Sequence, residues 1–109
     1  MADTALIWGA SGGIGSGLVE SLVEHGWQVA AVARRADSSV ARATWTAEAD
    51  VSDEAAVQRA VQELAQQAGE VNWWLYAAGD ILSSPLEGMQ LADWQRILQA
   101  NLTGVVLTA

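Results

Sequence analysis

The sequence of 109 residues contains no cysteine, no lysine and no phenylalanine, and it has only one histidine, one tyrosine and one proline. Without cysteine, the chain has neither a disulfide framework nor a reactive thiolate. A single histidine cannot build the His/Cys cluster that a structural zinc ion requires, so we predict no metal site. In the absence of phenylalanine, we expect the six tryptophans to fill core or near-core positions.

Positive charge is also scarce, because five arginines stand against 13 acidic residues and give a formal net charge of −8. Such a chain is repelled by polyanions, so we expect neither nucleic acid nor an anionic membrane as a partner. No apolar run reaches the ~20 residues that a membrane-spanning helix needs, and the first residues lack the basic region of a signal peptide. These features favour a cytoplasmic setting.

The most informative segment follows the first apolar run and consists of Gly9-Ala10-Ser11-Gly12-Gly13-Ile14-Gly15. Glycines in such a segment permit a tight turn, a close approach of backbone to a pyrophosphate, and packing of a helix on a strand. The segment has no basic side chain, so an anion would be bound by backbone N–H groups at a helix N-terminus. This turn between a strand and a helix predicts a dinucleotide site, and an ordinary turn is the alternative.

Apolar runs alternate with helical patterns along the chain. The runs at residues 4–8, 28–33, 42–48 and 71–79 predict strands, and residues 17–26, 52–69 and 91–109 follow helical spacing, with Ser52 as the expected N-cap of the middle helix. Strands separated by helices form parallel sheets with helices on both faces. We therefore predict one α/β domain over residues 1–109, a partial Rossmann-type three-layer parallel sheet of about four strands with flanking helices.

Two adjacent arginines, Arg34 and Arg35, follow the second predicted strand. In dinucleotide sites, an acidic side chain about twenty residues after the glycines binds the ribose 2′-hydroxyl of NAD, whereas a positive side chain accommodates the 2′-phosphate of NADP. The arginines therefore favour NADP over NAD. A solvated pair of arginines is the alternative, and the nearby Asp37 leaves NAD open.

Three further segments are expected beside the same edge of the sheet. Asp50 and Val51 follow the third strand, where they can bind adenine through the carboxylate and the apolar side chain, or simply cap the next helix. Ala78 and Gly79 end the fourth strand and can admit backbone beside the ribose and nicotinamide, or merely terminate the strand. Asn101 occupies a helical position where the spacing predicts an apolar residue, so it either satisfies buried backbone groups or orders water near the nicotinamide.

Taken together, these residues resemble the short-chain dehydrogenase/reductase family. The resemblance covers the whole chain and runs through the glycine segment, Arg34, Asp50-Val51, Ala77-Ala78-Gly79, Leu91-Ala92-Asp93-Trp94 and Asn101-Leu102-Thr103-Gly104. It implies an oxidoreductase that transfers hydride between NADPH and a carbonyl or alcohol substrate. The implied cofactor-binding residues are Gly9, Ser11, Gly13, Ile14, Gly15, Asp50, Val51, Ala78 and Gly79, and Asn101 matches the catalytic asparagine that positions a proton-relay water. The spacing of Gly9, Gly12 and Gly15 also fits an extended, epimerase-like branch, which is an alternative.

The chain departs from the family pattern in several places. Trp8 replaces the usual threonine before the first glycine, and Tyr76-Ala77 replaces an asparagine pair. The family's Tyr-x-x-x-Lys motif is missing because the chain has no lysine, and Ser83 and Ser84 precede the Asn101 helix, whereas the family's serine follows it. Asn101 is therefore the only catalytic residue that the resemblance transfers, and we expect this chain alone to be inactive.

The end of the sequence raises the question of what completes the fold. The strand at residues 71–79 would be an uncovered sheet edge, so we expect self-association and a homo-oligomer. One hypothesis is a truncated, amino-terminal part of an NADP-dependent oxidoreductase. The other is a non-catalytic NADP-binding module that a partner subunit completes.

Overall fold

A computed structural model describes residues 3–35, 40–79 and 87–109 of the chain. The strands are β1 (Thr4–Trp8), β2 (Gln28–Ala33), β3 (Trp45–Glu48) and β4 (Trp73–Tyr76). The helices are α1 (Gly13–Glu24), α2 (Glu54–Ala68), α3 (Leu91–Leu98) and α4 (Gly104–Thr108), and a π-helical turn, Gln99–Thr103, joins α3 to α4. We refer to this last segment as the π turn.

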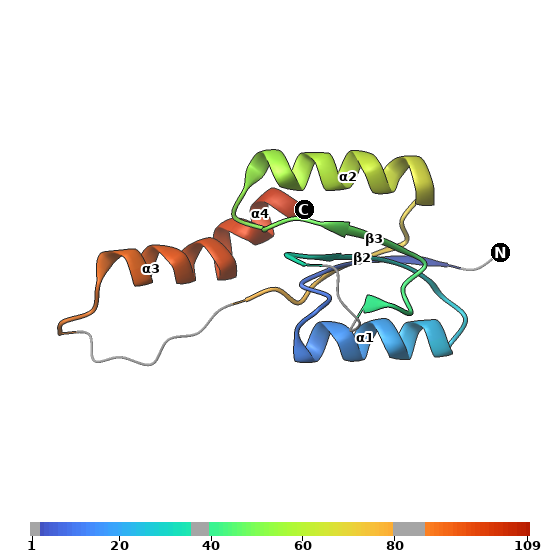
Figure 1. Cartoon of the computed structure of the whole chain (residues 1–109), viewed down its shortest axis with the longest axis horizontal. Helices are drawn as coiled ribbons and strands as arrows, with labels where there is room; N and C mark the ends of the chain where they lie inside the picture. Colours follow the sequence, from blue (N-terminus) through green and yellow to red (C-terminus); the bar gives the residue numbers. More distant parts are fainter. Residues whose placement is uncertain (1–2, 36–39, 80–86) are drawn as a thin grey trace.

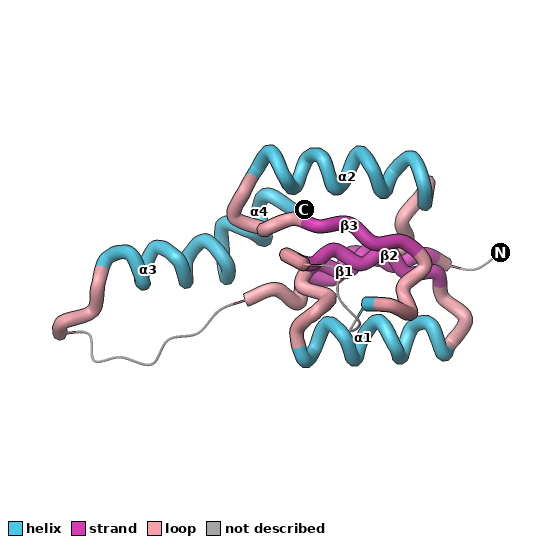
Figure 2. Tube along the Cα trace, in the orientation of Figure 1, coloured by secondary structure: helices cyan, strands magenta, loops and turns pink. Residues whose placement is uncertain are grey.

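The four strands form one parallel sheet in the order β3-β2-β1-β4. Figure 1 shows α1 on one face of this sheet and α2 with α4 on the other, and Figure 2 shows the three layers in the same orientation. The predicted α/β class, the parallel sheet and its three layers are therefore confirmed. Because the strands are parallel, their carboxyl ends meet at one edge of the sheet.

Strands β1 and β2 lie in the middle of the sheet and bury both of their faces. Ile7 and Val29 face α1 in one apolar cluster, whereas Trp8 and Val32 face α2 in another. Alternating side chains of one strand thus serve two cores, which is why these strands consist almost entirely of apolar residues. Packing in these two clusters holds α1 and α2 against the sheet, next to the strand ends where the glycine segment begins.

The N-cap of α2 differs from the prediction. The cap is Asp53, whose carboxylate accepts a hydrogen bond from the Ala56 N–H at 3.1 Å. Ser52 instead donates its hydroxyl and its backbone N–H to Asp50 Oδ1, at 2.7 and 2.9 Å. Asp50 therefore forms a turn with Ser52 before the helix begins, and this turn moves the cap one residue along the chain.

The last helical segment also differs from the prediction of one continuous helix over residues 91–109. The segment is helical, but the π turn interrupts it, and no residue of α3 or of the π turn is buried. Figure 1 shows α3 extending away from the sheet. Leu91 and Trp94 are consequently 67% and 48% exposed.

The tryptophans only partly follow the expectation that they fill core or near-core positions. Trp8 is completely buried, and its indole Nε1 is without a hydrogen-bond partner among the described residues. Trp73, Trp74 and Trp94 are exposed, and the first two lie on β4, at the edge of the sheet. The uncovered edge predicted for the fourth strand is therefore present in the described part of the chain.

None of the helices within the described residues has the length and apolar character needed to cross a membrane.

Candidate functional site

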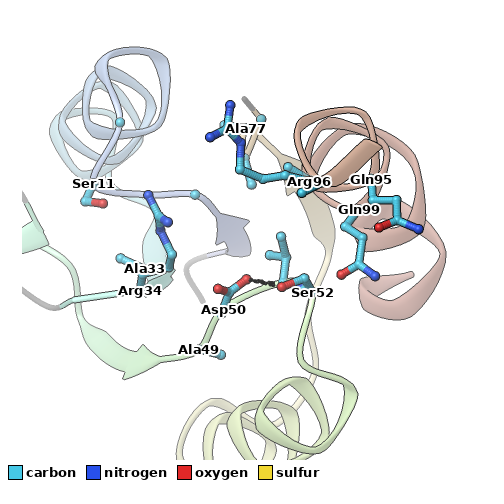
Figure 3. A pocket seen from close by; sticks show the side chains of 17 residues that line it. Ser11, Ala33, Arg34, Ala49, Asp50, Ser52, Ala77, Gln95, Arg96 and Gln99 are labelled. Carbon is cyan, nitrogen blue, oxygen red and sulfur yellow. Dashed lines mark hydrogen bonds between the residues drawn. The ribbon is translucent and has the colours of Figure 1, made fainter. Parts of the chain in front are cut away.

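A cavity of about 480 Å³ lies at the carboxyl ends of the strands. Its walls come from the turn after β1, the ends of β2, β3 and β4, and the face of α3 and the π turn that looks back toward the sheet (Figure 3). The lining residues are Gly9, Ser11, Gly12, Ala33, Arg34, Ala49, Asp50, Val51, Ser52, Ala77, Ala78, Gly79, Ala92, Gln95, Arg96, Gln99 and Ala100. Segments far apart in the sequence thus share one site.

The turn after β1 depends on close backbone packing at two glycines. Gly9 has a φ of +76°, and a Cβ there would lie 2.5 Å from Ala78 Cα at the end of β4. A Cβ on Gly15 would collide with the Gly9 carbonyl oxygen and lie 2.9 Å from Ala10 Cα. The first glycine therefore allows β4 to approach the turn, and the second allows α1 to approach it.

Helix α1 begins directly at the cavity. Its N-cap is Gly12, which lines the cavity and makes no side-chain cap bond. The first helical N–H groups of α1 come from the residues that follow, and such groups have no carbonyl partner in their own helix. The arrangement can accept an anion through backbone N–H groups and the positive end of the helix dipole.

Asp50 and Arg34 supply the charged groups on the sheet side of the cavity, as Figure 3 shows. The two hydrogen bonds from Ser52, first its backbone N–H and then its hydroxyl, hold the pKa of Asp50 below its ordinary value, and the Arg34 charge lowers it further against the opposing effect of burial. Both Ser52 bonds end on Oδ1. Asp50 is therefore an ionised acceptor at neutral pH, with Oδ2 as its second oxygen.

Sequence reasoning did not identify the opposite wall. This wall includes Gln95 and Arg96 from α3 and Gln99 from the π turn (Figure 3). Arg96 lies 3.9 Å from the Asp93 carboxylate on the same helix. The only available signal was the helical spacing of these polar residues, which also describes an ordinary solvated helix face.

Tyr76 connects the end of β4 to the π turn. Its hydroxyl donates a hydrogen bond to the Ala100 carbonyl, and its ring stacks on Trp74 with centroids 6.1 Å apart. Burial, and secondarily the negative charge of Asp50, raises the pKa of Tyr76 above its ordinary value. The phenol therefore stays protonated at neutral pH and remains a donor.

Asn101 is exposed, although the helical spacing predicts an apolar residue at its position. Its side chain lies against Gly79, where a Cβ would come within 2.8 Å of Asn101 Oδ1. Gly79 lines the cavity, whereas Asn101, which contacts it, is not among the lining residues. The structure thus brings Asn101 beside the end of β4, as the sequence order alone does not require.

The other predicted site residues divide into two groups. Those that line the cavity are Gly9, Ser11, Gly12, Arg34, Asp50, Val51, Ala78 and Gly79. Those that do not line it are Gly13, Ile14, Gly15, Arg35 and Asn101. Gly13, Ile14 and Gly15 form the first turn of α1, with the Ile14 side chain 77% exposed. Asp37, Ser83 and Ser84 lie outside the described residues.

The profile of the family described as short chain dehydrogenase matches residues 3–109. Among curated proteins, serine 3-dehydrogenase of Agrobacterium fabrum is 31% identical over 113 residues, which cover 97% of this chain and 45% of that protein. Among solved structures, the ligand-free aldohexose dehydrogenase of Thermoplasma acidophilum gives a TM-score of 0.87 at 24% identity, covering 98% of this chain and 41% of that one. The structure of ElxO with NADPH bound gives a TM-score of 0.85 at 20% identity, covering 99% and 48%.

The chain therefore spans about half the length of the relatives that it matches, 45% in the case of the serine 3-dehydrogenase. Within this chain the family match begins at residue 3 and continues to residue 109. The solved neighbours have the same fold as the parallel sheet and flanking helices described above. The chain belongs to the short-chain dehydrogenase/reductase family of oxidoreductases.

Proposed function

We propose that this chain binds NADP(H) and forms the cofactor-binding part of an oxidoreductase that moves hydride between NADPH and a carbonyl or alcohol substrate. The observation that carries the proposal is the position of Arg34 on the wall of the same cavity as the glycine turn and the Asp50 carboxylate. A cation at the end of β2 is the group that favours a ribose 2′-phosphate over a 2′-hydroxyl.

The residues present fit a dinucleotide. The cavity is within the range of roughly 300–1,000 Å³ that is usual for small-molecule sites. At its glycine turn, Gly9 and Gly12 keep the floor free of side chains, so that backbone can approach a pyrophosphate. The N–H groups of Gly13, Ile14 and Gly15, in the first turn of α1, complete this anion site.

We assign the other lining residues to the adenosine end and the nicotinamide end of the cofactor. Asp50 would accept the adenine amino hydrogen through Oδ2, with Val51 beneath the ring and Arg34 at the 2′-phosphate. The backbone of Ala78 and Gly79 would lie beside the ribose and nicotinamide. When bound, the nicotinamide supplies the hydride chemistry, and Asn101 would hold a water for the proton that accompanies it.

The test compares two dinucleotides and two arginines. We expect NADPH to bind more tightly than NADH, and Arg34→Ala to weaken NADPH about 10- to 100-fold, as the loss of a charge-assisted phosphate contact predicts. NADH affinity should change much less. Arg35→Ala is the matched control, because Arg35 does not line the cavity. Calorimetry gives the affinities of the unmodified chain and of both variants for the two dinucleotides, and equal affinities of the unmodified chain for NADPH and NADH would refute the assignment of Arg34.

We further propose that turnover requires residues that this chain does not carry. The sequence has no lysine, so it lacks the Tyr-x-x-x-Lys motif that its family resemblance leads us to expect. We therefore expect the chain to bind NADPH without oxidising it in the presence of aldehydes or ketones, as followed by absorbance of the reduced nicotinamide. Turnover by the chain alone would disprove this point and leave the binding proposal intact.

A further inference from the structure

Two glycines allow close contact between the β4 region and the helical segment that follows it, because each glycine lies against a side chain from the other region. Gly79, in the segment that follows β4, makes room for the side chain of Asn101 from the π turn. Gly104, at the start of α4, makes room for Tyr76 from β4, because a Cβ there would collide with the Tyr76 hydroxyl oxygen. The contact is therefore reciprocal: the β4 region provides Tyr76 and Gly79, and the helical segment provides Gly104 and Asn101.

The hydrogen bonds of the π turn explain why the Tyr76 hydroxyl matters there. In a regular α-helix the Gly104 N–H would bond the Ala100 carbonyl, four residues earlier. In this chain the Gly104 N–H bonds the Gln99 carbonyl instead, five residues earlier. The Ala100 carbonyl accepts the Tyr76 hydroxyl. A side-chain donor on a helix carbonyl is one of the recognised causes of a local break in the helical ladder.

A second tether acts farther along the same pair of elements. Trp74 Nε1 donates to the Thr108 carbonyl at 3.0 Å, near the end of α4. This bond joins the same strand to the same helical segment, but it does not touch the π turn. Trp74→Phe therefore provides a matched comparison, because it removes this bond and keeps an aromatic ring beside Tyr76, without releasing the Ala100 carbonyl.

We propose that Tyr76 is a positioning residue for Asn101: its hydroxyl, donated to the Ala100 carbonyl and seated against Gly104, holds the π turn that places the Asn101 side chain against Gly79. The importance of this for chemistry rests on the function proposed above. Ala100 and Asn101 are adjacent, so a change in the direction of the Ala100 carbonyl turns the next side chain as well. The aromatic ring at position 76 thereby acts on the site without lining the cavity.

The composition of the chain makes the proposal measurable. It contains two asparagines, Asn72 and Asn101, so asparagine-selective isotope labelling yields two side-chain amide signals. Asn72 lies at the opposite end of β4, where its Oδ1 accepts the Thr4 N–H at 2.8 Å. Its signal is an internal reference, and Asn101→Asp identifies the other one.

The test compares Tyr76→Phe with Trp74→Phe in the whole chain by NMR. We expect Tyr76→Phe to shift the Asn101 amide signal by more than its linewidth while Asn72 stays in place. Trp74→Phe should leave both signals unchanged. The proposal is overturned if the Asn101 signal of Tyr76→Phe coincides with that of the unmodified chain, or if both variants move it equally, because either result reduces Tyr76 to a general structural tether.

A second measurement keeps a phenol at position 76, so it does not depend on whether the Tyr76→Phe variant folds. Tyr76 is the only tyrosine, so 3-fluorotyrosine introduces one fluorine signal and a more acidic phenol at one position. Asp50 is the titratable group whose charge acts on this phenol, and residues 99–108 contain none. We expect the Asn101 side-chain carbonyl carbon to shift with the same pH midpoint as the fluorine, because an ionised phenol cannot donate. An Asn101 signal that stays flat through that midpoint overturns the proposal.

The affinity for NADPH separates this inference from the proposed function. If Tyr76→Phe moves the Asn101 signal and leaves the NADPH affinity unchanged, positioning and cofactor binding are distinct, as proposed. If the unmodified chain binds no dinucleotide, the proposed function fails, whereas the coupling between Tyr76 and Asn101 is still decided by the two amide signals. Loss of NADPH affinity in Tyr76→Phe equal to that in Arg34→Ala would overturn the assignment of Tyr76 as a residue that acts only through Asn101.

Discussion

The two sides of the cavity are built in different ways. On the β1 side, the shape depends on backbone, because Gly9 and Gly15 leave no space for a Cβ and the nearest atoms belong to neighbouring main chains. On the β4 side, the contacts are made by side chains, because Tyr76 and Trp74 attach the helical segment through its carbonyls. An added Cβ at Gly9 or Gly15 would collide with main-chain atoms. The hydrogen bonds of Tyr76 and Trp74, in contrast, can be removed separately by substitution of each side chain.

The sharpest test of this contrast uses two glycines of α1. Gly15→Ala should lower the free energy of unfolding by about 2–5 kcal/mol, because its Cβ meets the Gly9 carbonyl and Ala10 Cα, and neither can move freely. Gly17→Ala is the matched control, since a Cβ there meets nothing within 4 Å. It should stabilise the chain by up to about 1 kcal/mol through helix propensity. Urea denaturation gives both values, and equal effects of the two substitutions would contradict a backbone-limited turn.

A smaller effect is expected at the β4 side, where Gly104→Ala forces its Cβ against the Tyr76 hydroxyl and to 3.0 Å from Val51 Cγ2. We predict a loss of about 1–3 kcal/mol in the unmodified chain. In the Tyr76→Phe background the loss should be smaller, because the obstructing oxygen is gone. A double-mutant cycle should therefore show a coupling of about 0.5–3 kcal/mol, and additive losses would show that Tyr76 and Gly104 do not share one contact.

The pH dependence should reveal the Tyr76 tether with a smaller effect. The pKa of Tyr76 in the folded chain lies above the 10.0 of a free phenol, chiefly because of burial and then because of Asp50. The stabilisation linked to its proton is therefore complete below the unfolded pKa and is lost as the pH rises through the folded pKa. The difference in unfolding free energy between the unmodified chain and Tyr76→Phe should shrink above about pH 10. A constant difference at all pH values would argue against the phenol as a donor.

The smallest effect on stability is expected on the outer face of α3. Leu91→Gln and Trp94→Gln alter side chains that are already 67% and 48% exposed, so we predict changes within about 0.5 kcal/mol. If this apolar face contributes to the homo-oligomer that we propose, the same substitutions should reduce self-association in light scattering. Val61→Gln, on α2 and 41% exposed, is the control and should leave the association unchanged. Monomers in the unmodified chain would contradict a homo-oligomer.

The sequence was most informative where local pattern and glycine chemistry coincide. The strand at residues 28–33 matches β2 (Gln28–Ala33), and the glycine segment lies where the order of strand and helix predicts it. The N-cap of α2 was wrong by one residue, because the Asp50–Ser52 turn competes for the hydroxyl that would otherwise cap the helix. Local rules give the presence of an element more reliably than its exact boundary.

The β4 side could not be predicted, because its contacts join residues that are distant in the sequence. Tyr76 contacts Ala100 and Gly104, and nothing in the residues between them indicates a π turn. Gly104 was the one available signal, since glycine inside a helical pattern suggests close approach by another element. The wall formed by Gln95 and Gln99 was missed for a similar reason, as its position depends on where α3 lies in space.

The most direct test of the central claim is a map of backbone amide shifts as NADPH is added to the isotope-labelled chain. The account predicts shifts at Gly9, Gly12 and Gly79, which line the cavity, and at the first turn of α1. The amides of Gly26 and Gly69, in turns that do not line the cavity, should stay in place. Shifts confined to other surfaces, or no shifts at saturating NADPH, would contradict a dinucleotide site at the carboxyl edge of this sheet.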